Sequence, residues 1–341
     1  MWRRLIISAV LLAGVTVAGP ADARAREPAP QPSTLPSSLW KRAFAFDDKR
    51  IDESSGLFAS NGHPGVIWTF NDKKGPVRLY AVGPDGKTQA VVTLDGHEGV
   101  DPEAMGGAVG LDGTNYLYVG DIGGNPAPRP DGIVVYQLVE PAKLADASVE
   151  ATAYKLTYPD GLHDAETLLV DPRTRELYVV TKGPQGGNIY RAPADLSETR
   201  PNMLTWVREL PYVISDGLIA PNGDMILRSY NKVRIWKGVE GALTSVLDIP
   251  QQEQGEGIAI TPDGKSLLIS SEGPLSPVWR MDLPAELGVH EPAPPDDTAV
   301  SALEEEIAGM PLWLWGAGGG VVALLLAAGL VVVMRRESRA W

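Results

Sequence analysis

The feature that most constrains this chain is an internal repeat that begins near residue 50 and ends near residue 284. An acidic residue followed by a short apolar strand occurs five times, and each time a turn rich in Gly, Pro, Asn or Asp leads to further strands. Four short strands per unit, at spacings of 50, 63, 50 and 40 residues, are typical of a β-propeller. The repeated acidic residues are Glu53, Glu103, Glu166, Asp216 and Glu256.

The repeat predicts an all-β fold, a β-propeller with five four-stranded blades. Six blades are the alternative, if one blade has lost the pattern. The fifth unit shows no clear fourth strand within residues 253–284, whereas residues 39–46 (LWKRAFAF) have the pattern of a strand placed before the first unit. Because each blade is buried only against its neighbours, the ring must close. We expect the N-terminal strand to complete the last blade.

The two ends of the chain predict export and membrane anchoring. Residues 1–25 combine a basic start, an uncharged apolar stretch and an A-x-A site, which is typical of a cleavable signal peptide. Residues 310–334 contain 24 consecutive residues without charge, with Trp at one end and Arg beyond the other, and predict one transmembrane helix. We therefore expect a single-pass cell-membrane protein whose N-terminal domain is extracellular and whose residues 335–341 form a short basic cytoplasmic tail.

Between these ends, composition indicates a Pro-rich linker (26–38), the propeller ectodomain (39–284) and a Pro-rich, then acidic stalk (285–309). The net charge of the whole chain is −13, and because residues 1–25 and 335–341 each carry +2, the remainder is at about −17. Such a domain lacks the basic surface that nucleic-acid binding requires. The chain has no cysteine, which excludes disulfides and thiol chemistry.

The repeated acidic residues predict a metal site. The first strand of each propeller blade lines the central channel, so we expect all five carboxylates near one mouth of it. Their mutual repulsion requires either protonation or a bound cation. Hard oxygen ligands from several segments suit Ca²⁺, whereas zinc is a poor fit to a chain with no cysteine and four histidines. The alternative is that these residues cap turns or face water.

Polar residues near the ends of the second strands form a second set of candidates. Lys182 and Arg228 could bind an anionic substrate, and His163, close to Glu166 in sequence, could act as a general base. Each could equally be an ordinary surface side chain. The remaining polar residues expected on this loop face are Asn71, Asp72, Asp121, Asn125, Asn231 and Glu272.

Several segments carry a resemblance to a known family: VIWTFND at 66–72, YLYVGDIGGN at 116–125 and DGLHDAETLLVDP at 160–172. They resemble a family of secreted bacterial β-propellers common in actinobacteria, and the resemblance covers most of residues 45–240. It implies the propeller fold, but no settled activity.

This chain departs from the family pattern at two points. Where the family has a string similar to D-W-E-D-[IM]-A, residues 100–105 read VDPEAM, so Glu103 is kept and the Trp and second Asp are not. Gly124 stands where the family usually has Asp. More distantly, the acidic ring resembles that of calcium-bearing propeller hydrolases: lactonases, phytases and nucleotidases.

Three functions are compatible with these features. The first is a surface module that binds a ligand or a protein. The second is a Ca²⁺-dependent hydrolase of a phosphoester or lactone, which needs an open coordination position and a nearby base. The third is a purely structural propeller. The sequence shows metal ligands but no clear base, which favours the binding module.

Overall fold

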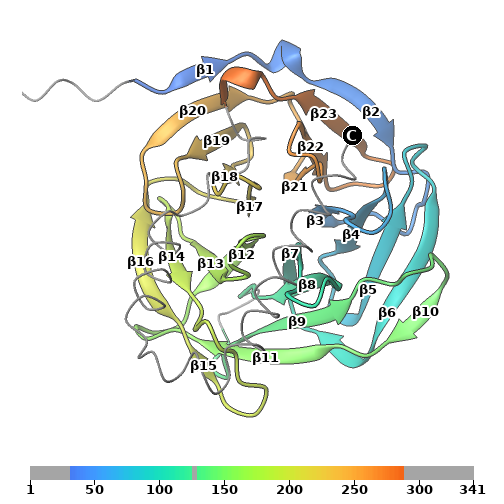
Figure 1. The fold of residues 1–341 in the computed structure, drawn as a ribbon, viewed down its shortest axis with the longest axis vertical. Coiled ribbons are helices and arrows are strands. Elements are labelled where there is room, and N and C mark those ends of the chain that lie inside the picture. Colours follow the sequence, from blue (N-terminus) through green and yellow to red (C-terminus); the bar gives the residue numbers. More distant parts are fainter. Residues whose placement is uncertain (1–30, 125–128, 288–341) are drawn as a thin grey trace, which may run out of the picture.

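The computed structural model describes residues 31–124 and 129–287, and in this part of the chain the strands form five sheets arranged around a central axis (Figure 1). This confirms the five-bladed all-β propeller. The predicted signal peptide, transmembrane helix and cytoplasmic tail lie outside the described residues, as do residues 26–30 of the linker and 288–309 of the stalk. Among the residues that the structure describes, no helix has the length and apolar character that crossing a membrane requires.

The blades follow one another along the chain, and within each blade four strands pair antiparallel from the channel outwards. Blade 1 contains β3 (Ser54–Ala59), β4 (Ile67–Asn71), β5 (Gly75–Val82) and β6 (Thr88–Gly99). Blade 2 contains β7 (Pro102–Val109), β8 (Asn115–Asp121), β9 (Ile133–Val139) and β11 (Thr152–Thr157). Blade 3 contains β12 (Asp164–Val170), β13 (Leu177–Lys182), β14 (Gly187–Arg191) and β16 (Thr205–Leu210).

Blades 4 and 5 complete the ring. Blade 4 contains β17 (Asp216–Ile219), β18 (Met225–Arg228), β19 (Lys232–Trp236) and β20 (Leu243–Asp248). Blade 5 contains β21 (Gly255–Ile260), β22 (Ser266–Ser271), β23 (Pro277–Asp282) and the N-terminal β2 (Lys41–Ala45). Two 3₁₀ turns, η1 (Ser37–Leu39) and η2 (Ala285–Leu287), lie near the ends of the described chain.

The ring closes as predicted, because β2 pairs antiparallel with β23 and supplies the outer strand of blade 5. Three short additional strands were not predicted. β1 (Ser33–Leu35) pairs parallel with β20, β10 (Ala147–Val149) with β6, and β15 (Asn202–Met203) with β11. In each case the segment before the outer strand of one blade pairs with the outer strand of the preceding blade. The N-terminal segment therefore joins blades 4 and 5 twice, through β1 and through β2.

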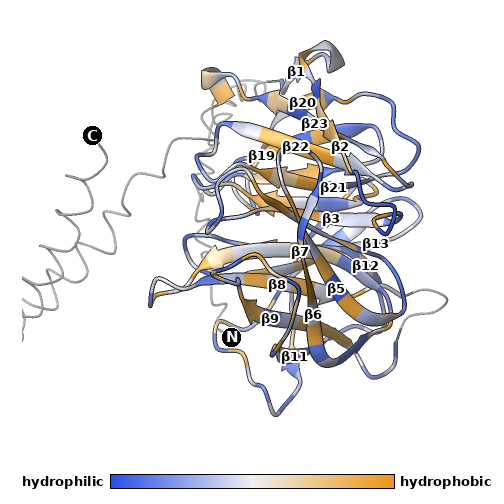
Figure 2. Cartoon of the chain, turned by 90° about the vertical axis from the view of Figure 1, so that its right-hand side faces the viewer, coloured by the Kyte–Doolittle hydropathy of each residue, from blue (hydrophilic) through white to orange (hydrophobic). Residues whose placement is uncertain are grey.

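The core consists of apolar layers between adjacent blades rather than a single centre. The described chain contains five buried apolar clusters, and each one draws its residues from two neighbouring blades. Trp68 of blade 1, for example, packs with Met105 and Leu117 of blade 2. Apolar residues run along the stacked strands in Figure 2. Burial between blades explains why no blade is expected to be stable alone.

The five inner strands run in the same direction along the channel and contact one another around the ring. Their first residues surround one mouth of the channel, where charged side chains gather. Their last residues surround the opposite mouth, which holds an apolar cavity of about 210 Å³. Each inner strand contributes to it, through Leu57, Met105, Leu168, Ile219 and Ile258 among others. The two mouths therefore differ sharply in polarity.

Candidate functional site

The charged mouth of the channel contains a polar cavity of about 330 Å³, which we call the acidic mouth. Six carboxylates and one ammonium group line it, so its field is strongly negative. Blades 1, 2, 3 and 5 supply these side chains from the starts of their inner strands and the ends of their second strands. The lining residues are Asp72, Glu103, Gly124, Asp164, Glu166, Lys182, Gln254, Glu256 and Glu272.

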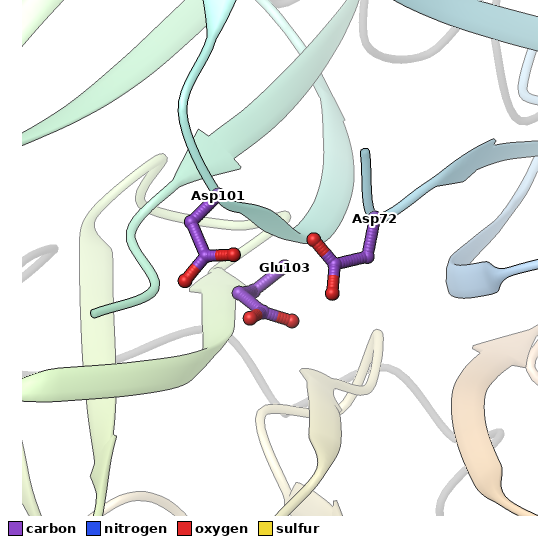
Figure 3. Close-up of side chains that lie close together, drawn as sticks. All are labelled: Asp72, Asp101 and Glu103. Atoms are coloured by element: carbon purple, nitrogen blue, oxygen red, sulfur yellow. The ribbon is translucent and has the colours of Figure 1, made fainter. Parts of the chain in front are cut away.

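A compact group of carboxylates from blades 1 and 2 lies at the acidic mouth (Figure 3). Asp72 directly follows β4, Asp101 directly precedes β7, and Glu103 is the second residue of β7. One oxygen from each of the three side chains lies within 4.8 Å of the others. Oxygens on opposite sides of a Ca²⁺ ion, each about 2.3–2.6 Å from it, are separated by about this distance. The spacing and the hard-oxygen donors fit a calcium site.

Burial and mutual repulsion change the acidity of these groups. Burial, reinforced by the Asp101 and Glu166 charges, raises the pKa of Asp72 to about 7. The same causes, burial first and then Glu166 and Asp72, raise the pKa of Glu103 to about 11. The pKa of Glu256 rises to about 8, again through burial and then Glu166. A cation would offset this repulsion and return the carboxyls to their charged form.

Glu256 contributes a deeply buried carboxyl group to the acidic mouth. Its side chain lies in β21, lines the acidic mouth and is only 3% exposed. Its Oε2 atom is buried and has no hydrogen-bond partner among the residues that the structure describes. A buried carboxylate without partners is costly in its charged form, which is why burial raises the pKa of Glu256.

Lys182 places a positive charge inside the acidic mouth. Its Nζ donates to Glu166 Oε1 at 2.7 Å and lies 5.9 Å from the centre of the Tyr230 ring. Burial alone would lower the pKa of Lys182, but the Glu166 carboxylate outweighs it and raises that pKa. Burial raises the pKa of Glu166, and Lys182 opposes this rise. The pair gives this side of the mouth a balanced charge, unlike the side formed by blades 1 and 2.

Of the five repeated carboxylates, the structure brings Glu103, Glu166 and Glu256 together at the acidic mouth. Glu53 lies outside the lining, half-exposed at the rim, with its carboxylate 3.7 Å from Lys73 Nζ. The reason is register: Glu53 precedes β3, and Ser55 is the second residue of that strand, as Glu103 is of β7. Asp216 is the first residue of β17, and its side chain is fully buried outside the mouth.

Arg228 also lies elsewhere than predicted. Its guanidinium is fully buried and donates to the carbonyls of Gly257 and Ser270 and to the side-chain oxygen of Gln252. Asp216 Oδ2 accepts from the Ile258 amide at 2.8 Å. Asp216 and Arg228 of blade 4 therefore both bond to β21 of blade 5, the strand that carries Glu256. Neither of these two residues lines the acidic mouth.

His163 and the remaining loop residues occupy varied positions. His163 lies in an aromatic cluster with Tyr158 and Tyr190 and bonds Asp160 at 3.0 Å, away from the acidic mouth. Asp72 and Glu272 line the mouth, and Asn231 is exposed on the β18–β19 turn. Asn125 lies outside the described residues.

Asn71 and Asp121 have equivalent structural roles in blades 1 and 2. Each accepts hydrogen bonds from two backbone amides just before the inner strand of its blade: Asn71 from residues 52 and 53, and Asp121 from residues 100 and 101. Asp121 also pairs with Arg129 at 3.0 Å. Both fix the entry to the inner strand, and Asp121 thereby positions Asp101.

Two carboxylates of the site, Asp101 and Asp164, were not among the residues predicted from the sequence. Each lies two positions before a site glutamate, in the strings Asp101-Pro-Glu103 and Asp164-Ala-Glu166. In both blades the pairing of the inner strand with the second strand shifts register at the glutamate, between Pro102 and Ala104 and between Ala165 and Thr167. An irregularity of this kind can redirect a side chain towards the channel. Gln254 and Glu256 of blade 5 repeat this spacing with an amide in the first position.

The fold and the site together define a class: a five-bladed β-propeller whose channel has one acidic mouth. The chain matches no protein-family model, and it matches no curated protein. Among solved structures it is similar to a gluconolactonase from Xanthomonas campestris, with 14% identity over 69% of this chain and 88% of that one and a TM-score of 0.39.

Two further solved structures show similar agreement. The calcium-binding protein regucalcin of Agrobacterium tumefaciens has 12% identity over 74% of this chain and 95% of that one, with a TM-score of 0.41. A chain of the nidogen/laminin complex has 12% identity, 65% and 73% coverage and a TM-score of 0.40. Lactonase and calcium-binding proteins are thus among the similar structures, as the distant resemblance implied. The site itself is interpreted from the residues of this chain.

Proposed function

We propose that this protein is a membrane-anchored extracellular β-propeller that binds a surface ligand or protein at its acidic mouth through a Ca²⁺ ion. The observation that carries the proposal is the meeting of Asp72, Asp101 and Glu103, whose oxygens lie within 4.8 Å of one another. The excess of carboxylates over ammonium groups in the lining of the acidic mouth supports it. Three carboxylates leave part of the 6–8 coordination positions of Ca²⁺ for ligand oxygens.

The direction of the last strand bears on how the proposed anchor would orient the acidic mouth. β23 runs away from the acidic mouth and ends at Asp282 on the opposite face, next to the apolar end of the channel. An anchor formed by residues 310–334 would follow from this face. The acidic mouth would then point away from the membrane, where an external ligand can reach it.

Thermal unfolding of the purified full chain, with Ca²⁺ and with a chelator, tests the cation site. Ca²⁺ that binds only the native state stabilises it by about 2.7 kcal/mol at one hundred times its Kd. We expect a Ca²⁺-dependent rise in Tm that Glu103→Gln abolishes. Glu150→Gln, a matched change at an exposed position on the outer edge of blade 2, should keep the rise. Equal Tm values with Ca²⁺ and chelator in the unmodified protein would contradict the proposal.

A Ca²⁺-dependent hydrolase is the second candidate, and one observation favours it. Lys182 lies 2.7 Å from Glu166 in the same cavity as the proposed cation site, where an ammonium group can stabilise developing negative charge. Turnover of lactones or phosphoesters that requires Ca²⁺ and falls at least about tenfold in Lys182→Met would favour it. The purely structural alternative is disfavoured by the polar cavity, which a filled channel would lack.

A further inference from the structure

The outer strands of the blades differ in whether another strand covers them. In blades 1, 2 and 4 a short strand pairs parallel with the outer strand: β10 with β6, β15 with β11 and β1 with β20. Blades 3 and 5 end at β16 and β2, and no described strand pairs with the outer side of either. The same position at the edge of the ring is therefore filled in three blades and open in two (Figure 1).

The length of one connection explains why β16 is open. β10 and β15 come from the connection between the third and outer strands of the next blade, residues 140–151 in blade 2 and 192–204 in blade 3. In blade 4 this connection is much shorter, residues 237–242. It approaches blade 3 through a side chain, because Arg208 of β16 donates to the Gly241 carbonyl at 2.9 Å. No strand forms there to cover the backbone edge of β16 in the described chain.

The backbone of β16 matches that of a covered strand. In β20 the pairing with the third strand shifts register around Thr244, and β1 pairs with the residues that follow, Ser245 to Leu247. β16 has the same shift around Val207, and Arg208 to Leu210 follow it. The leucine that ends each of these two runs is fully buried. The edge of β16 therefore shares the local geometry that accepts a parallel strand in blade 4.

Two side chains of β16 are suited to recognise an added strand. Trp206 is 52% exposed, and its Nε1 donates to Asn188 Oδ1 at 3.0 Å. Asn188 is also the cross-strand partner of the exposed Glu209, so Trp206 and Glu209 lie on the same face of the sheet. An indole can anchor an apolar side chain of a neighbouring strand, and a carboxylate favours a basic residue beside it.

The open edge of β2 is protected in ways that β16 is not. Lys41 and Arg42 place two exposed positive charges on it, and charges of one sign discourage the addition of another strand. The β5–β6 turn of blade 1 also lies against its end, where the Gly86 carbonyl accepts from the Asp47 amide at 2.9 Å. β16 therefore differs from the other open edge in its charge and in its exposed indole.

The chemistry of the chain itself disfavours an occupant from the same protein. The N-terminal linker contains Pro28, Pro30 and Pro32, which cannot donate to a strand ladder. Residues 288–309 contain six acidic residues and no Lys or Arg, so they would meet Glu209 with like charge. A second copy would bring the same net charge of about −17. The open edge therefore fits a segment of a different protein.

We propose that the outer edge of β16 is a docking site for an extended peptide segment of a partner protein. The segment adds to blade 3 as a fifth strand parallel to β16, as β1 adds to blade 4. Backbone hydrogen bonds supply affinity, whereas an apolar side chain beside Trp206 and a basic one beside Glu209 supply selectivity. This interface lies at the rim of the ring and does not depend on the cation site at the acidic mouth.

Selection of displayed random octapeptides on the purified full chain, followed by fluorescence polarisation of the enriched peptides, tests this proposal. We expect these peptides to combine Lys or Arg with Val, Ile or Thr, and Trp206→Ala to weaken their binding at least about tenfold. Glu209→Lys should weaken it about two- to tenfold. The matched control is Glu150→Lys, at an exposed position of blade 2, whose outer strand β15 already covers. It should leave binding unchanged.

Hydrogen exchange separates strand addition from other modes of binding. A peptide that pairs with β16 should slow the exchange of amides in Thr205–Leu210, because a hydrogen-bonded amide exchanges more slowly. Protection at the acidic mouth instead, full binding by Trp206→Ala, or the absence of any enriched peptide would overturn the proposal. Thermal unfolding of Trp206→Ala checks that lost binding is not lost folding, since a half-exposed indole contributes little to stability.

Light scattering distinguishes a peptide partner from a second copy of this chain. We expect the unmodified protein and Trp206→Ala to have the same mass at every protein concentration. A dimer that forms in the unmodified protein and is lost in Trp206→Ala would show that β16 pairs with a second copy, and it would overturn the proposed partner.

Discussion

At the scale of single residues, position within the inner strand decides what each charge of the repeat does. Glu256 and Asp216 occupy similar places in neighbouring blades, yet Glu256 opens into the acidic mouth and Asp216 accepts from the Ile258 and Gly217 amides inside the protein. A shift of one strand position turns a side chain to the other face. The repeated acidic residue therefore lines the site in some blades, whereas in blade 4 it forms a hydrogen bond to the next blade.

The raised pKa values of Asp72 and Glu256 predict how stability depends on pH without Ca²⁺. In the folded protein, Asp72 and Glu256 have pKa values of about 7 and 8. In the unfolded chain the same carboxyl groups lose their protons near the ordinary pKa of Asp and Glu, about 4. The native state then binds more protons between about pH 4 and 8, so the free energy of unfolding falls as pH rises through this range. Chemical denaturation in chelator at several pH values measures this decrease.

Ca²⁺ should reverse the trend, because it binds the deprotonated carboxylates and therefore binds more tightly at higher pH. The matched variant Asp72→Asn cannot titrate and should show a flatter decrease between about pH 4 and 7. A free energy of unfolding that rises with pH across this range in chelator would contradict the assignment of these pKa values.

At the scale of elements, the N-terminal segment that carries β1 and β2 closes the ring. Trp40 lies between these two strands, is 5% exposed and donates from Nε1 to the Asp248 carbonyl of β20 at 3.0 Å. It packs in the apolar cluster between blades 4 and 5. The segment thus joins these blades by strand pairing and by a buried side chain.

Trp40→Ala should lower the free energy of unfolding by about 3–5 kcal/mol, the usual cost of removing a buried aromatic side chain. Urea denaturation with chelator present measures the loss. Trp206→Ala, which removes a half-exposed indole from the outer strand of blade 3, is the control and should cost far less. Equal losses in the two variants would show that Trp40 does not stabilise the closure.

The elements also show what the sequence could and could not predict. The repeat and the missing fourth strand of the last unit were sufficient for five blades and for closure by β2. β1, β10 and β15 have two or three residues each, too few for a periodic pattern, and their partners are set by the packing of blades. Glu53 was misplaced because the acidic residue of blade 1 lies two positions before Ser55, the residue of β3 that corresponds to Glu103 of β7.

At the scale of the whole molecule, the channel is polarised. One mouth gathers carboxylates from four blades, and the other is lined by apolar residues from all five inner strands. β23 ends on the apolar side, so an anchor formed by residues 310–334 would follow from that face. The polarity of the channel and the direction of the chain together predict the orientation of the propeller on a membrane.

A pair of single-cysteine variants tests this orientation, and the chain suits the experiment because it has no cysteine of its own. Leu111 is 89% exposed on the turn that joins β7 to β8, on the apolar face. Asn231 is exposed on the β18–β19 turn, on the acidic face. After labelling of the full chain in vesicles, energy transfer to an acceptor on lipid headgroups should be greater for Leu111→Cys than for Asn231→Cys. Equal or reversed transfer would show that the acidic mouth does not point away from the membrane.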